Sequence, residues 1–79
     1  MARVLLFGPL RDLAGWRERE VEAASLAELR SCLASEDADL GAALIGPGVQ
    51  VAVDQTIVRG DASLSVRSEV AFLPPMSGG

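Results

Sequence analysis

With 79 residues, 49% of them apolar, and a formal net charge of −4, the chain is long enough for one domain, residues 1–79, and too apolar for a disordered segment. It has no histidine and its seven basic residues are scattered arginines, which argues against a self-contained active site, a metal centre or a nucleic-acid interface. It has no apolar run of the roughly 18–20 residues that cross a membrane, no signal-peptide layout at its start and a single cysteine, Cys32, so we expect a cytoplasmic protein without a membrane partner.

Two strands are predicted before the first long helix. Residues 2–8 carry apolar side chains on both faces near their end, as in a central strand, and Leu5 and Phe7 share one of these faces. The proline that follows ends the strand, and residues 9–15 (PLRDLAG) are predicted as a short turn or helical loop. Residues 16–23 (WREREVEA) alternate between charged and less polar side chains, which predicts an edge strand paired with the first.

One main helix is predicted over residues 25–35. Ser25 and Glu28 form a capping box, which is a start signal for a helix, and three leucines follow at helical spacing, at positions 26, 29 and 33. Residues 40–45 (LGAALI) are predicted to form one more helical turn, which Gly46-Pro47-Gly48 ends.

The remaining predicted elements are strands. Valines at alternate positions predict a strand over residues 49–53, and a turn at Asp54-Gln55 leads into a short strand over residues 56–58. A polar loop follows, and residues 69–73 (EVAFL) form the last strand. This order predicts an α+β domain of the β-grasp, or ubiquitin-like, type: a mixed sheet of about five strands covered on one face by one main helix.

The last six residues, PPMSGG at positions 74–79, are predicted to be a tail that extends from the sheet. Pro74 and Pro75 favour a stiff, extended departure, and Gly78 and Gly79 have no Cβ. Such a tail can enter a channel too narrow for other residue types, and its terminal acyl carbon is unhindered. We therefore interpret Gly79, with Gly78 before it, as the reactive end of the molecule; the alternative is an ordinary frayed terminus.

The second face of the predicted sheet has no helix to cover it. Phe7, Ile57 and Leu73 are candidates for an apolar partner-binding surface on that face, and the alternative is that some of them complete the core. Arg11 is a candidate for an ion pair with a partner, against the alternative of a solvated pair with its neighbour in the loop. Cys32 is interpreted as a packing residue, because a lone cysteine without a basic cluster is a poor nucleophile.

The chain resembles the ThiS/MoaD family of ubiquitin-like sulfur carriers over nearly its whole length, and within that family the small subunits of molybdopterin synthase. The resemblance rests on the opening VLLFGPLRDLAG, the hairpin VAVDQTIV and above all the ending EVAFLPPMSGG. The consecutive prolines Pro74-Pro75 and the length of the chain favour this group over the carriers of thiamine synthesis. Two positions depart from the family pattern. Leu73 stands where the family more often has an aromatic residue, and Met76 stands where it more often has valine.

The resemblance implies a function for the chain. A ubiquitin-activating-type adenylyltransferase would use ATP to adenylate the Gly79 carboxylate, and a sulfur donor would then convert it to a thiocarboxylate. The chain would pass this sulfur to cyclic pyranopterin monophosphate during molybdenum cofactor biosynthesis, docked on the large catalytic subunit of molybdopterin synthase. The residues implied in partner binding are Phe7, Arg11, Ile57, Leu73, Pro74 and Pro75.

The resemblance also implies how the chain is assembled and what it lacks. Two small subunits would flank a dimer of large subunits in a heterotetramer. The chain would be the non-catalytic subunit of this sulfurtransferase, with no cofactor and no metal bound to it.

Three other functions stay open on the sequence alone. The chain could carry sulfur for another pathway, such as thiamine synthesis, or act as a ubiquitin-like protein modifier whose Gly79 is joined to lysines of other proteins. It could also be a β-grasp interaction domain with an inert tail. Because the chain has no lysine, a modifier of this sequence could not build chains on itself.

Overall fold

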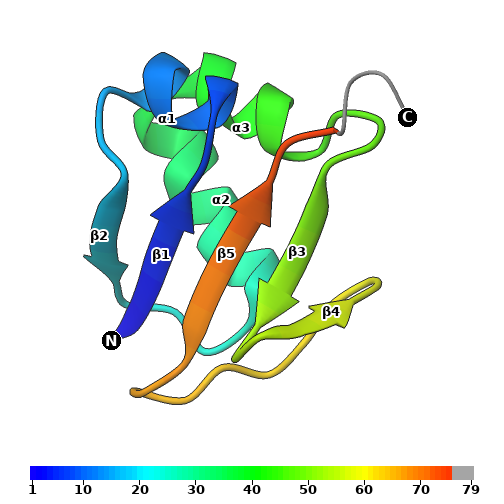
Figure 1. Cartoon of the computed structure of the whole chain (residues 1–79). Coiled ribbons are helices and arrows are strands. Elements are labelled where there is room, and N and C mark those ends of the chain that lie inside the picture. Colours follow the sequence, from blue (N-terminus) through cyan, green and yellow to red (C-terminus); the bar gives the residue numbers. More distant parts are fainter. Residues whose placement is uncertain (76–79) are drawn as a thin grey trace.

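A computed structural model describes residues 1–75 of the chain, and these residues form five strands and three helices (Figure 1). The five predicted strands are all present, the last two with the predicted bounds. In chain order the elements are β1 (Ala2–Leu6), α1 (Pro9–Ala14), β2 (Glu18–Val21), α2 (Leu26–Glu36), α3 (Ala38–Leu44), β3 (Gln50–Val53), β4 (Thr56–Val58) and β5 (Glu69–Leu73).

The strands form one mixed sheet in the order β2-β1-β5-β3-β4. The first and last strands of the chain, β1 and β5, are parallel, and the other neighbouring pairs are antiparallel. Parallel neighbours need a long crossover connection, which the helices between them provide. β5 therefore lies at the centre of the sheet, between β1 and β3 (Figure 1), and the predicted β-grasp architecture is confirmed.

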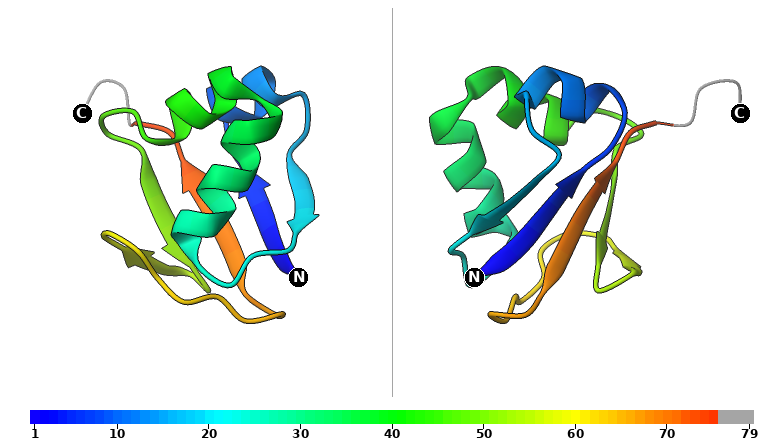
Figure 2. Two further views of the ribbon diagram at one scale, coloured as in Figure 1. Left: turned by 180° about the vertical axis from the view of Figure 1, so that it is seen from behind. Right: turned by 60° about the vertical axis from the view of Figure 1, so that its left-hand side comes forward.

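The helices cover one face of the sheet and leave the other face without a covering layer (Figure 2). The side chains between the two layers form the core, and each is at most 2% exposed: Val4, Leu6, Val51, Val70 and Phe72 from the sheet, and Leu26, Leu29, Leu33, Leu40 and Leu44 from the helices. Fully burying one such side chain stabilises a fold by about 1.5–3 kcal/mol. Of the helices in residues 1–75, none is long and apolar enough to cross a membrane.

The start of α2 is capped from two directions. The Ser25 hydroxyl accepts a hydrogen bond from the Glu28 amide at 3.1 Å, as the predicted capping box requires. Asp61, from the loop between β4 and β5, accepts hydrogen bonds from the Ala27 amide at 2.9 Å and from the Ala62 amide at 2.8 Å. These bonds favour the charged carboxylate and hold the pKa of Asp61 below its ordinary value of 3.8. Asp61 therefore ties the long loop to the N-terminal end of α2.

The helical layer is larger than predicted. The segment predicted as a turn or helical loop is the helix α1, which ends at Gly15 with a φ of 83°. The extra turn predicted over residues 40–45 is the seven-residue helix α3, which begins earlier because the Asp37 carboxylate accepts a hydrogen bond from the Leu40 amide at 3.1 Å. The prediction of one covering helix was therefore incomplete, although α2 is the longest of the three.

The predicted turn between β3 and β4 is confirmed. Asp54 and Gln55 have φ angles of 50° and 70°, the left-handed geometry that a two-residue hairpin turn needs. The Asp54 carboxylate also accepts a hydrogen bond from the Glu69 amide at 2.9 Å, and the Asp54 amide donates to the Glu69 carbonyl at 2.8 Å. These two bonds fix the turn against the beginning of β5.

Candidate functional site

The chain leaves the sheet from its central strand. β5 has a hydrogen-bonded neighbour on each side, and its Val70 and Phe72 side chains are fully buried. Pro74 follows directly and is half-buried, and Pro75 is exposed. The predicted reactive residues, Gly78 and Gly79, lie outside the described residues, so the structure defines the base of the tail only.

A row of small and apolar side chains crosses the open face of the sheet. Leu5 of β1 is paired with Ala71 of β5, Ala71 with Ala52 of β3, and Ala52 with Ile57 of β4. The alternation of the strands places all four on the face opposite the core residues Leu6, Val51 and Phe72. Ala52 is only 8% exposed, so the surface of this row is provided by the half-buried Leu5 and Ala71 and by the exposed Ile57.

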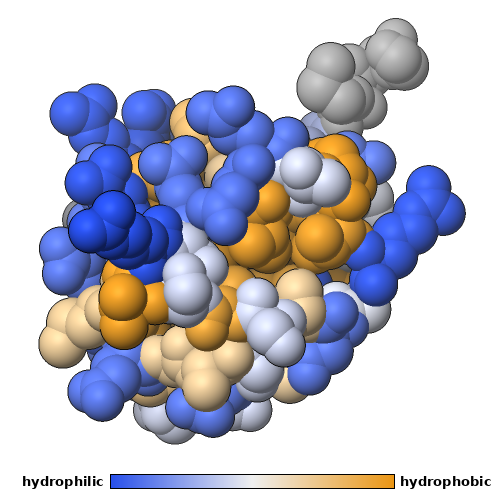
Figure 3. Space-filling view, turned by 90° about the horizontal axis from the view of Figure 1, so that it is seen from below, coloured by the Kyte–Doolittle hydropathy of each residue, from blue (hydrophilic) through white to orange (hydrophobic). Residues whose placement is uncertain are grey.

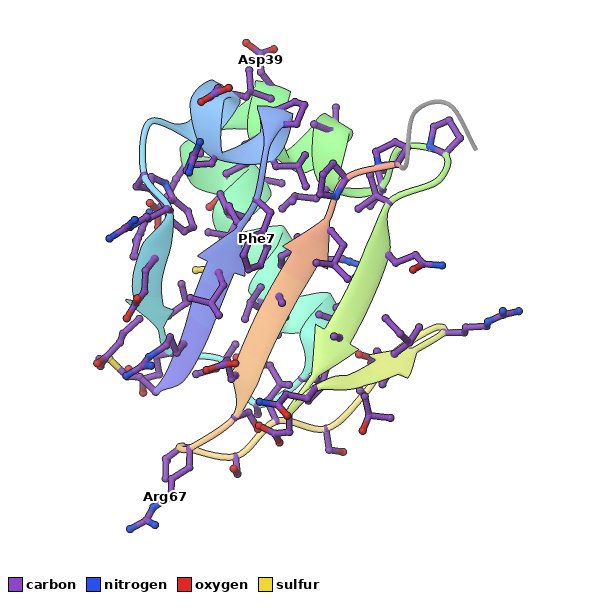
Figure 4. The ribbon with its side chains drawn as sticks, in the orientation of Figure 1. Phe7, Asp39 and Arg67 are labelled. Atoms are coloured by element: carbon purple, nitrogen blue, oxygen red, sulfur yellow. The ribbon has the colours of Figure 1, made fainter. Side chains whose placement is uncertain are left out.

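Phe7 and Leu73 continue this apolar face toward the base of the tail. Each lies two residues beyond a member of the row, Phe7 beyond Leu5 and Leu73 beyond Ala71. Phe7 is 45% exposed and Ile57 is 47% exposed, whereas Leu73 is half-buried. Figure 4 places Phe7 on the open side of the sheet, near the end of β1. We call Leu5, Phe7, Ala52, Ile57, Ala71 and Leu73 the outer apolar face.

The opposite end of the open face is charged. Arg3 of β1 makes ion pairs with Glu18 at 3.2 Å and with Glu69 at 3.9 Å, and all three side chains are substantially exposed. Exposed pairs of this kind add little to stability. Seen from the end of the molecule that carries the N-terminus, the surface shows apolar areas separated by charged side chains (Figure 3). The open face thus changes from charged at that end to apolar at the end where the tail begins.

Arg11 lies on α1, close in the chain to Phe7. Its Nε atom is 3.9 Å from the Asp12 carboxylate, and the two side chains are 50% and 77% exposed. Such a long, solvated contact holds the guanidinium weakly, so Arg11 is accessible to a partner. A partner-binding role for Arg11 stays a prediction, as it does for Phe7, Ile57, Leu73, Pro74 and Pro75.

Cys32 packs against the core from α2 and is half-buried, which confirms its predicted packing role. Among residues 1–75, no three acidic or cysteine side chains lie close enough together to hold a metal ion. The described part of the chain therefore offers a surface and an anchored tail base as its candidate functional features.

Ala52 and Ala71 belong to the outer apolar face, although neither residue stands out in the sequence as a candidate for it. Alanine carries no strong signal in a strand, because it is compatible with either face and with helices. Their spacing from Phe72 and Val51 could have placed them, since neighbours in a strand point to opposite faces.

Comparison with known proteins gives consistent matches. The model of the ThiS family matches residues 4–79. Over 81 aligned residues, which cover the whole of both chains, the sequence is 37% identical to the molybdopterin synthase sulfur carrier subunit of Escherichia coli (strain K12).

Solved structures match in fold. The small archaeal modifier protein 1 (SAMP1) from Methanosarcina acetivorans superposes with a TM-score of 0.88 at 20% identity, over 99% of this chain and 95% of that one. The complex of subunits 1 and 2 of the molybdopterin-converting factor from Helicobacter pylori 26695 contains a chain that superposes with a TM-score of 0.73 at 23% identity, over 99% and 97% of the two chains. At these identities the likeness concerns the fold alone.

Proposed function

The chain belongs to the ThiS family, and from this premise we propose that it carries sulfur on its C-terminal residue, Gly79, for the synthesis of the molybdenum cofactor. The observation that carries the proposal is the 37% identity, over the full length of both chains, to a molybdopterin synthase sulfur carrier subunit. The anchored base of the tail and the adjoining outer apolar face support it, because a carrier needs a presented end and a docking surface.

The proposed chemistry begins at the terminal carboxylate. An oxygen of the Gly79 carboxylate attacks the α-phosphorus of ATP in an adenylyltransferase of the ubiquitin-activating type, and pyrophosphate leaves. A sulfide-level nucleophile from a sulfur donor then attacks the acyl carbon and displaces AMP, which leaves a thiocarboxylate. Glycine suits this position because it has no Cβ to hinder either attack.

The catalytic groups for these steps come from partner proteins. The chain has no histidine, and among neutral-pH general bases histidine is the most common. We propose that the chain binds no cofactor or metal itself, that the adenylyltransferase binds ATP, and that both act with this chain in the cytoplasm. The contribution of this chain is to fold, to dock and to present its end.

Docking is proposed to use the outer apolar face. Phe7 and Ile57 are nearly half exposed, and the face adjoins the base of the tail, so a partner that covers the face is placed to receive the tail. The proposed partner is the large catalytic subunit of molybdopterin synthase, which would transfer the sulfur to cyclic pyranopterin monophosphate in a heterotetramer with two copies of each subunit. The two-subunit complex from H. pylori supports a partner of this kind.

Mass spectrometry of the protein isolated from its native cells tests the chemistry. A carrier contains a species in which one carboxyl oxygen is replaced by sulfur, and this species disappears when an alanine is added after Gly79. The matched control adds an alanine after Met1, which leaves the reactive end unchanged. The proposal is wrong if the C-terminally extended protein still supports full cofactor synthesis without being processed.

A second candidate function is that of a protein modifier, since a protein of the same fold from M. acetivorans is named small archaeal modifier protein 1. A modifier would appear in conjugates of higher mass that are lost on deletion of Gly79, and a carrier would not. A carrier for another pathway, such as thiamine synthesis, would form the same thiocarboxylate without co-purifying with a molybdopterin synthase large subunit. Mass spectrometry of the thiocarboxylate and of conjugates, together with co-purification of a molybdopterin synthase large subunit, separates a molybdenum-cofactor carrier, a carrier of another pathway and a modifier.

A further inference from the structure

The two prolines at the base of the tail rest against two glycines. A Cβ atom at Gly8 would lie 3.2 Å from Cγ of Pro74. A Cβ atom at Gly48 would lie 2.9 Å from Cβ, 3.3 Å from Cγ and 3.6 Å from Cα of Pro75. Carbon atoms in favourable contact are about 3.5–4.0 Å apart. Each proline ring therefore occupies space that a side chain on the facing residue would need.

The two glycines come from loops on opposite sides of the departing chain. Gly8 follows β1 and is the N-cap of α1, and Gly48 lies in the loop between α3 and β3. Since β1 and β3 are the two neighbours of β5, these loops flank the chain where it leaves the sheet (Figure 1). Both glycines have left-handed backbones, with φ angles of 57° and 84°, which other residues adopt at a cost.

We propose that Gly8 and Gly48 form a seat that sets the direction in which the tail leaves the sheet. This inference rests on the proposed function, because direction matters only if the end of the tail must reach an active site. The seat acts on rigid groups: each proline has a fixed φ, so a shift of its ring turns the backbone that follows. Gly8 and Gly48 are thus positioning residues for Gly79.

The direction of the backbone at the seat sets the region that the end of the tail can reach. Four residues follow Pro75, and an extended chain of that length spans at most about 14 Å. A change in the direction of the backbone at Pro75 therefore changes the region that the four following residues can reach. Misplacing a reacting atom by about 1 Å can reduce a rate by about 100-fold. A methyl group at position 48 changes the contact with Pro75, because at 2.9 Å from Cβ of Pro75 either the proline ring or the loop that carries residue 48 must shift.

The test compares Gly48→Ala with Gly60→Ala. Gly60 also has a left-handed backbone, with a φ of 81°, but a Cβ there would have no atom within 4 Å. Both variants therefore carry the same kind of backbone strain, and only Gly48→Ala changes the contact with Pro75. With the chain as substrate of its adenylyltransferase, we expect Gly48→Ala to lower kcat by about tenfold or more relative to Gly60→Ala, with KM less affected because the substitution leaves the exposed side chains of the folded domain unchanged. Equal kcat values for the two variants would overturn the proposal.

A double-mutant cycle with Pro75→Gly tests whether the effect acts through the proline. Pro75→Gly removes the ring that the new methyl group of Gly48→Ala meets, so we expect Gly48→Ala to have no further effect on kcat in the Pro75→Gly background. A merely destabilising substitution would add its full effect in both backgrounds, and that result would refute the seat.

Nuclear magnetic resonance of the wild-type chain keeps the inference separate from the proposed function. The seat predicts nuclear Overhauser effects between the α protons of Gly48 and the β protons of Pro75, whether or not Gly79 ever carries sulfur. Their absence would overturn the seat even if Gly48→Ala failed to fold. If the contacts are present but the wild-type chain is never adenylated, the proposed function fails, and the positioning role fails with it.

Discussion

Truncation of Phe7 to alanine tests the outer apolar face as the docking surface. Phe7 is 45% exposed, and a phenylalanine presents about 200 Å², so about 90 Å² of it remains for a partner to cover. At about 25 cal/mol per Å² this area is worth about 2 kcal/mol of binding free energy. We therefore expect Phe7→Ala to weaken the complex with the large subunit of molybdopterin synthase by about 30-fold.

Isothermal titration calorimetry with the purified large subunit measures this loss. The matched control is Val66→Ala, because Val66 is 76% exposed in the loop between β4 and β5 and its carbonyl accepts a hydrogen bond from the N-terminal amino group at 3.3 Å, at the end of β1 away from the tail. We expect the control to bind like the wild type. Thermal unfolding of both variants, with titration well below either melting temperature, ensures that folded protein is compared.

Two results would show that the outer apolar face is not the docking surface. If Phe7→Ala binds within about twofold of the wild type, then less than about 0.5 kcal/mol comes from this side chain, and Phe7 lies outside the interface. If Val66→Ala weakens binding instead, the docking surface lies at the charged end of the molecule. In either case the docking surface would not be the apolar face that adjoins the base of the tail.

Three further predictions concern stability. Gln55→Gly should stabilise the fold by about 0.5–1 kcal/mol, since Gln55 has a φ of 70° that glycine adopts without strain, and a melting temperature equal to or below that of the wild type would contradict this. Asp61→Asn should reduce the difference in unfolding free energy between pH 7 and pH 3. The lowered pKa of Asp61 means that its charged form stabilises the fold above about pH 3.8, and this contribution is lost as the pH falls through the folded-state pKa. Urea unfolding at pH 7 and pH 3 measures the effect, and an unchanged difference between the two pH values would exclude it. Gly41→Ala should destabilise the fold by about 1–2 kcal/mol despite the gain in helix propensity, because the new Cβ would overlap Ala34 and lie 2.7 Å from its Cα; a denaturation midpoint at or above that of the wild type would show that α2 and α3 separate freely.

The positions of the strands were predictable because each carries a local signal. The alternation of valines near residue 50 and the EVAFL segment give a period of two, and the turn at Asp54-Gln55 gives a sharp boundary. The same alternation assigned Phe7 and Ile57 to the open face, and their exposure agrees. These features depend on residues that are neighbours in the chain, so the sequence alone contains them.

The extent of the helical layer was harder to predict. Residues 35–39 are polar, which is typical of a loop, yet Asp37 caps α3 and the helix is held by Leu40 and Leu44, which are buried against the core. A short helix gains most of its stability from tertiary packing rather than from propensity. Its length is therefore decided by the surface on which it packs, and the sequence of the segment does not describe that surface.

The amino-acid sequence determined which residues form strands, which face of each strand is apolar, and that the chain ends in a proline step and two glycines. The tertiary structure decided that β5 lies between β1 and β3, and hence that Pro74 and Pro75 leave the sheet between Gly8 and Gly48. Periodicity describes one strand at a time, whereas the neighbours of a strand depend on how the chain crosses the sheet. The contacts at the base of the tail join segments far apart in the sequence, so only the folded chain brings them together.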